Sequence, residues 1–374
     1  MVTNKIHGII VAFVLLTLIG CGSKPEVIKI GYIGPLSGPS AVLGMDAIQA
    51  IEIAANEVNA QGGINGLPIE IIAEDDQYIP AKTLTAYEKL VNVDGVEILL
   101  VSTYGGVFTI ADRAQEDNVI VIDPLDCNNE LAALPENVFC LATETESIGY
   151  ALADYLLSQG KTRAGVMYST KDNFMALVSD AFKRKFSQGG GFTKEENFVY
   201  TDVDFKTQLL KLNEIKPDAI VFLGHDETGI AMKQARDLGI TAQFMATGTV
   251  TSPGLQQASH GAAEGTIFAY WEPAADNSLS KEFEAKFVSL VGRPPILPLT
   301  THPAYDSMQV LIKNSLPQSV KRVDRTERVD AIRRGLYSTK RFEGTTGEIT
   351  MDSDGAVRIK ESAFRLENGR PVLI

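Results

Sequence analysis

The chain has 374 residues, which is enough for two domains that each bury a core of their own. It is 45% hydrophobic and 22% charged, which indicates a globular protein with a solvated surface. Its formal net charge of −13 is spread along the sequence and leaves no basic stripe, so we expect no nucleic-acid partner.

The first 20 residues have the features of a secretory signal peptide. Lys5 gives a positive start, and the apolar run over 8–19 is too short to span a bilayer comfortably. The run ends in Leu-Ile-Gly-Cys21, which resembles the lipobox of bacterial lipoproteins, where the cysteine is lipidated and becomes the mature N-terminus; a chance cysteine is the alternative. The sequence predicts a signal peptide over 1–20, a lipid-anchored linker over 21–26, and an exported lipoprotein of the periplasm or cell surface.

The stretch over 28–66 predicts a strand, a Gly-Pro loop, a helix and a turn. β-Favouring residues over 28–33 are followed by four chain breakers: Gly34, Pro35, Gly38 and Pro39. Apolar residues then recur at helical spacing: Ala47, Ile48, Ile51, Ala54, Ala55 and Val58. A Gly-rich loop at a helix N-terminus can hold a polar ligand with its backbone N–H groups, but it can also be a plain connection.

Beyond this unit, strands and helices alternate. Strands are predicted over 67–73, 96–101, 119–122, 164–168, 197–201, 219–223, 243–246 and 266–270. Helices are predicted over 80–91, 107–116, 148–157, 174–186, 205–215, 228–238, 279–290, 304–316 and 325–336, with short strands over 342–374. This alternation predicts an α/β fold with parallel sheets covered on both faces. It starts afresh near Ser147, which indicates two lobes with a ligand cleft between them.

Several segments in this order resemble the branched-chain amino-acid binding proteins, which are type I periplasmic solute-binding proteins of ABC transporters. The matching runs are IKIGYIGPLSGPSAVLG, AANEVNAQGGINGLPIEIIAEDD, PDAIVFLGHDETGIAMKQARDLGITAQFM, AYDSMQVLIKN and FEGTTGEITMDSDG. The resemblance implies two doubly wound lobes joined by three crossovers, near 142–146, 270–273 and 339–342. Lobe 1 would comprise 27–143 plus 273–340, and lobe 2 would comprise 144–272 plus 341–374. Closure about these hinges would present the loaded protein to a permease.

The resemblance also implies the solute-binding positions of the first lobe. These are Leu43, Ser102, Thr103, Tyr104, Leu125, Cys127 and Asn128. Tyr104 stands where the family usually has Ser, and Cys127 stands where it has Thr, so the contacts to an α-carboxylate are expected to be weaker. Leu43 replaces the usual aromatic residue and makes this wall more apolar.

The second lobe departs further from the family pattern. Its matching positions are Asn173, Phe174, His225, Thr247, Gly248 and, beside a crossover, Trp271, which is either hinge packing or a cleft wall. Gly248 stands where the family usually has the acidic partner of the ligand ammonium, with Asp226 or Glu227 as possible substitutes. Losing that partner weakens the binding of a zwitterion by roughly one to two decades. We therefore expect an apolar or aromatic acid or amide in place of a standard α-amino acid.

The two remaining cysteines, Cys127 and Cys140, are expected either to form a disulfide in an oxidising compartment or to remain two buried thiols. The histidines are isolated from one another and no nucleophile stands beside a base, so we expect no metal, no cofactor and no enzymatic activity.

These observations together predict a monomeric solute-binding lipoprotein of an ABC importer, with a small organic solute, permease subunits and a membrane surface as partners. The alternatives are a sensory receptor of the same fold and a true branched-chain amino-acid binder with relocated contacts.

Overall fold

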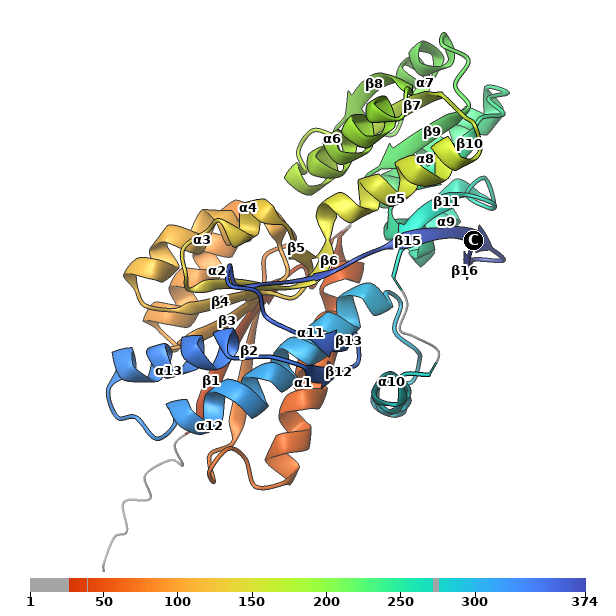
Figure 1. The fold of residues 1–374 in the computed structure, drawn as a ribbon. Helices are drawn as coiled ribbons and strands as arrows, with labels where there is room; N and C mark the ends of the chain where they lie inside the picture. Colours follow the sequence, from red (N-terminus) through yellow and green to blue (C-terminus); the bar gives the residue numbers. More distant parts are fainter. Residues whose placement is uncertain (1–26, 39, 272–275) are drawn as a thin grey trace, which may run out of the picture.

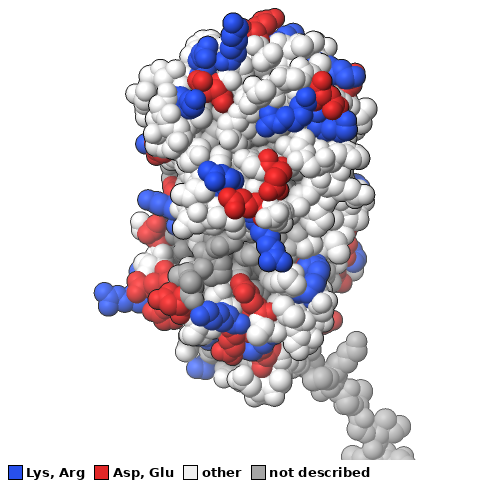
Figure 2. Space-filling view, turned by 90° about the vertical axis from the view of Figure 1, so that its right-hand side faces the viewer, with Lys and Arg blue, Asp and Glu red and all other residues white. Residues whose placement is uncertain are grey.

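The computed structural model describes residues 27–38, 40–271 and 276–374. The predicted signal peptide, the linker and the lipidation site Cys21 lie outside these residues. Figure 1 shows two α/β lobes, each built around one sheet. No helix in the described part of the chain is both long and apolar enough to cross a bilayer. Figure 2 shows acidic and basic side chains interspersed on one face of the molecule.

The first sheet is parallel throughout and has the order β14-β6-β4-β3-β1-β2, with β5 pairing with the same β6. Its strands are β1 (Ile28–Gly34), β2 (Ile69–Asp75), β3 (Ile98–Val101), β4 (Ile120–Asp123), β5 (Asp126–Cys127), β6 (Val138–Glu144) and β14 (Ala356–Ile359). Helices of this lobe are η1 (Ala41–Leu43), α1 (Met45–Ala60), α2 (Pro80–Asn92), α3 (Tyr104–Glu116), α4 (Asn129–Ala132), α10 (Ser278–Val291), α11 (Pro298–Val310), the π-helical turn η3 (Leu311–Ser315), α12 (Leu316–Ser319) and α13 (Arg325–Tyr337).

The second sheet has the order β16-β15-β11-β10-β9-β7-β8, in which only β15 and β16 run antiparallel to their neighbours. Its strands are β7 (Arg163–Ser169), β8 (Phe192–Phe198), β9 (Ala219–Leu223), β10 (Gln243–Ala246), β11 (Ile267–Tyr270), β15 (Ser362–Glu367) and β16 (Arg370–Leu373). Its helices are α5 (Thr145–Ser158), α6 (Asn173–Gln188), α7 (Lys206–Asn213), α8 (Glu227–Asp237), η2 (Gly248–Thr251) and α9 (Pro253–Ser259).

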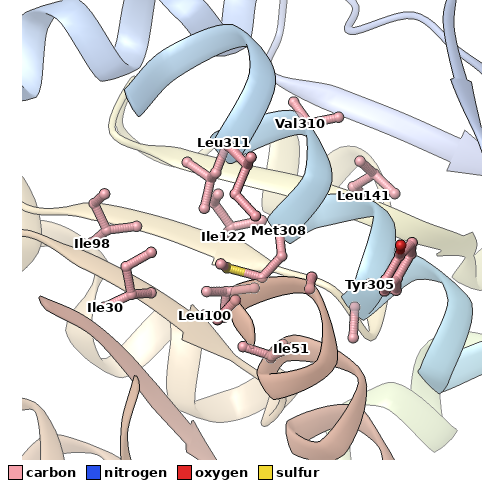
Figure 3. Close-up of a cluster of buried hydrophobic side chains, with 14 of the residues drawn as sticks. Ile30, Ile51, Ile98, Leu100, Ile122, Leu141, Tyr305, Met308, Val310 and Leu311 are labelled. Atoms are coloured by element: carbon pink, nitrogen blue, oxygen red, sulfur yellow. The ribbon is translucent and has the colours of Figure 1, made fainter. Parts of the chain in front are cut away.

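Each sheet is covered by helices on both faces, which explains why central strands such as β3 and β9 are apolar and buried along their whole length. In β3, Ile98 and Leu100 belong to the core that includes α1 and α11, whereas Leu99 and Val101 belong to the core under α2 and α3. Figure 3 shows Ile30, Ile98 and Leu100 of the sheet facing Met308 of α11. Because α11 follows the whole second sheet in sequence, the first lobe is assembled from segments far apart in the chain.

The third crossover lies later than the sequence predicted. The expected assignment of 341–374 to the second lobe is wrong for its first half, because β14 extends the first sheet and pairs with β6. The hairpin of β12 (Phe342–Gly344) and β13 (Gly347–Ile349) is likewise fixed to α11, where buried Asp306 accepts hydrogen bonds from the backbone N–H groups of Thr345 and Thr346, both at 2.8 Å. The chain therefore crosses between β14 and β15, at Lys360 and Glu361.

Candidate functional site

A cavity of about 40 Å³ lies between the two lobes at the carboxyl ends of several parallel strands. The first lobe lines it with Leu43, Tyr78, Leu125, Asp126, Thr143, Leu297 and Leu299. The second lobe contributes Ile148, Phe174, Met175, His225, Thr247, Gly248 and Thr249, and the third crossover contributes Glu361. This volume holds a few water molecules, so a larger solute requires movement of the lobes or of the lining side chains.

Most of the cavity wall is apolar. Leu43, Leu125 and Leu297 form a small buried cluster of their own in the first lobe. Phe174 faces them from the start of α6 and also contacts Tyr104 of the first lobe, with ring centroids 6.2 Å apart. This part of the wall is therefore complementary in polarity to an apolar group.

One polar group of the second lobe is His225, which is held in place by Asp172. The imidazole Nε2 lies 3.2 Å from Asp172 Oδ2, and Tyr200 donates its hydroxyl hydrogen to the same carboxylate. Burial alone would lower the pKa of His225, but the hydrogen bond and the charge of Asp172 outweigh it and raise that pKa. The His225 ring also meets Tyr78 of the first lobe edge-on, with centroids 5.8 Å apart.

Two carboxyl groups, Asp126 and Glu361, also line the cavity, beside the hydroxyl groups of Tyr78 and three threonines. Both are more than nine-tenths buried, with 3% and 8% of their surface exposed. Among the described residues, Asp126 Oδ2 and Glu361 Oε2 have no hydrogen-bond partner. Burial raises the pKa of Glu361 to about 8. Burial and the nearby charges of Asp123 and Asp172 also raise the pKa of Asp126.

Six of the positions predicted from sequence line this cavity: Leu43, Leu125, Phe174, His225, Thr247 and Gly248. At Gly248 the structure explains the missing acidic side chain. A Cβ atom there would lie 2.8 Å from Leu299 Cδ2 and 3.0 Å from a ring carbon of Tyr270, so a larger residue does not fit without displacement.

The other predicted first-lobe positions do not line the cavity. Ser102 and Thr103 are buried between β3 and α3 and are not part of its wall. The Tyr104 hydroxyl accepts a hydrogen bond from Asn128 Nδ2 at 2.9 Å, and Asn128 Oδ1 accepts one from the Leu131 N–H as the N-cap of α4. Cys127 is joined to Cys140 in a disulfide, which leaves it no thiol to offer a solute.

Two predicted second-lobe positions also lie elsewhere. Asn173 is exposed at the start of α6, and its neighbour Asp172 is the residue that turns inward. Trp271 packs against His302, with ring centroids 5.6 Å apart, and is not part of the cavity wall.

Sequence reasoning missed nine lining residues: Tyr78, Asp126, Thr143, Ile148, Met175, Thr249, Leu297, Leu299 and Glu361. Asp126 stands between two predicted positions, Leu125, which lines the cavity, and Cys127, which does not, so the loop was identified but this residue was missed. Glu361 was missed because the third crossover was placed about 20 residues too early.

Comparison with known proteins identifies the family. The family profile described as "Periplasmic binding protein" matches residues 27–364. A curated relative is Leu/Ile/Val-binding protein homolog 3 of Brucella melitensis, which is 25% identical over 92% of this chain and 93% of its own. The Leu/Ile/Val-binding protein of Escherichia coli is 26% identical over 82% and 85% of the two chains.

Solved structures share the fold over nearly the whole chain. A leucine binding protein from Thermotoga maritima superposes with a TM-score of 0.81 at 25% identity, covering 93% of this chain and 98% of its own. A solute binding protein of an ABC transporter from R. palustris, in complex with benzoate, has a TM-score of 0.78 at 20% identity and covers 93% and 96%. The latter likeness concerns the fold alone.

Proposed function

The chain belongs to the family of periplasmic binding proteins, and on that premise we propose that it is the lipid-anchored, monomeric solute-binding subunit of an ABC importer. Proteins of this family bind small solutes and work with the permeases of ABC transporters; they are binding proteins and not enzymes. The anchor in this proposal is Cys21, which follows the apolar run of the signal sequence.

The single observation that carries the proposal is the buried cavity shared by both lobes. Side chains of each lobe meet across it, since Tyr78 contacts His225 and Tyr104 contacts Phe174. In the described part of the chain, short crossovers join the lobes between β6 and α5 and between β14 and β15, and rotation about such segments opens and closes a cleft. A solute bound between the lobes would stabilise the closed form, which is the form that a permease can distinguish.

We propose a solute with an apolar or aromatic body that is not a standard α-amino acid. Leu43, Leu125 and Phe174 support the apolar body. An α-carboxylate would find no Lys or Arg side chain among the described residues of the cavity wall. Of the two head groups expected from sequence, an acid is therefore less well supported than an amide.

Titration calorimetry with leucine tests this proposal, together with a thermal-shift screen of small apolar solutes. We expect leucine to bind weakly, and a true solute at about a hundred times its Kd to add about 2.7 kcal/mol to the free energy of unfolding. Small-angle scattering should show a smaller radius of gyration with that solute. Leucine binding at nanomolar to low micromolar Kd would contradict the proposed solute class, and the absence of any stabilising solute would contradict the binding function.

A further inference from the structure

Asp126 and Glu361, two carboxyl groups that each carry one unpartnered oxygen, line the cavity at one edge of the first sheet. Asp126 of β5 is the cross-strand partner of Thr143 in β6, and Thr143 is paired on its other side with Ile359 of β14. Glu361 follows Ile359 by two residues, and the Thr143 hydroxyl hydrogen-bonds to its carboxyl group. The strand order therefore places Asp126 and Glu361 on either side of Thr143, facing the same space.

The surroundings of this carboxyl pair are acidic. Asp123 lies behind it at the end of β4, and Asp172 approaches from the N-terminus of α6. The only basic side chain in the described cavity wall is His225, which is already held by Asp172. Glu227 lies beyond it and accepts the His225 backbone N–H at 2.9 Å. Among the described residues of the cavity wall, the pair thus has no Lys or Arg countercharge.

We infer that the solute is an apolar monoamine whose ammonium group binds between Asp126 and Glu361 while its body packs against Leu43, Leu125 and Phe174. An ammonium group has three donors and a positive charge, so it can satisfy both unpartnered oxygens at once. The inference deepens the proposed solute-binding function and rests on it.

Other head groups fit the same geometry less well. A carboxylate would be repelled by either acidic group when that group is ionised, so it could bind only while both groups hold their protons. A neutral amide can donate to the pair but supplies no charge. The described part of the chain offers no ligand set for a metal ion. It contains no group of three or more His, Cys, Asp or Glu side chains that could hold one.

Matched solutes that differ only in the head group test the inference by calorimetry. Leucine, 4-methylpentanoate and 3-methylbutan-1-amine share one branched body; the second lacks the amine and the third lacks the carboxylate. Phenylalanine, 3-phenylpropanoate and 2-phenylethylamine form the aromatic series. In at least one series we expect the amine to bind ten times more tightly, or better, than the other two, which is the usual effect of one charged hydrogen bond.

Variants then locate the ammonium site. Asp126→Asn and Glu361→Gln keep the shape of each side chain but remove its charge, and each should weaken amine binding at least tenfold. Asp180→Asn is the matched control, because Asp180 is an exposed carboxylate on α6 whose side chain is 66% exposed. It should leave amine binding unchanged, and circular dichroism checks that all three variants fold.

Proton release on amine binding distinguishes a direct role of the carboxyl groups from a purely structural one, because a structural role would not change the number of protons released. An arriving ammonium ionises carboxyl groups that hold a proton, so amine binding near pH 7 should release protons, measured by calorimetry in buffers of different ionisation enthalpy. The Glu361→Gln variant should release fewer protons per bound amine than the wild type.

The inference would be overturned if, in both series, the amine bound no more tightly than the amino acid and the deaminated acid. Tight binding of an amino acid or of a deaminated acid would leave the solute-binding function standing, whereas failure of every solute to bind would count against both.

Discussion

At the scale of single residues, Glu361 links folding stability to pH. Its pKa is raised to about 8 by burial, whereas an unfolded Glu titrates near 4.3. Between these values the folded protein retains a proton that the unfolded chain has lost, so the free energy of unfolding falls as the pH rises. We expect Glu361→Gln to be more stable than the wild type at pH 8, by on the order of 1–3 kcal/mol, and equal to it near pH 4.

Urea denaturation at several pH values measures this difference. Asp123 has a raised pKa in both proteins, so its contribution largely cancels in the comparison. Besides burial, the Glu361 charge helps to raise the pKa of Asp126, so its removal relieves Asp126 as well, and the two effects act in the same direction. A stability difference that does not change between pH 4 and pH 8 would contradict the account.

Single positions in the site could be predicted only where a loop carried a recognisable pattern. Leu43 and Gly248 were found because their segments resemble a known family. Asp126 and Asp172 were each missed by one residue, since an alignment fixes a loop but does not fix which side chain turns inward. Asp172 is the N-cap of α6, accepting the Phe174 N–H at 3.0 Å, and this role orients it.

At the scale of elements, the disulfide ties β5 to β6 beneath the cavity. Cys127 and Cys140 are 13 residues apart, with Cα atoms separated by 5.2 Å. A bond that closes a loop of this length stabilises the fold by about 3 kcal/mol in the chain-entropy model. We expect the double variant Cys127→Ala, Cys140→Ala to lose about that much free energy of unfolding.

Denaturation with and without reductant supplies the control. Reductant should lower the stability of the wild type and leave that of the double variant unchanged. Equal sensitivity of the two proteins to reductant would show that the bond does not form in solution.

Helices and strands whose apolar residues repeat regularly were predicted well, and short elements were not. The helix predicted over 279–290 occurs as α10 (Ser278–Val291), because its apolar face repeats and Asn277 caps it. The strands after residue 342 are three to six residues long and show no clear alternation. Sheet membership of β14 depends on pairing with β6, some 215 residues earlier, which local sequence does not reveal.

At the scale of the whole molecule, aromatic contacts across the cleft favour the closed arrangement of the lobes. Phe174 of the second lobe meets Tyr104 of the first. Such a ring pair contributes about 0.5–1.5 kcal/mol beyond its buried area, enough to shift a balanced equilibrium several-fold. Phe174→Ala should therefore open the unliganded protein and increase its radius of gyration in small-angle scattering.

Phe108→Ala is the matched control for this effect. Phe108 packs on the same Tyr104 ring, with centroids 5.0 Å apart, but it belongs to the first lobe and does not bridge the cleft. Its loss should leave the radius of gyration unchanged. An equal increase in both variants would show that the Phe174 contact does not control closure.

The central claim is that the cleft binds an apolar amine, and the most direct test is to identify the small molecule that the native protein carries. The protein is purified without denaturant and then denatured, and the released compound is analysed by mass spectrometry. The account predicts an apolar primary amine without a carboxylate. Release of leucine, isoleucine or valine, or of a carboxylic acid without an amine, would contradict it.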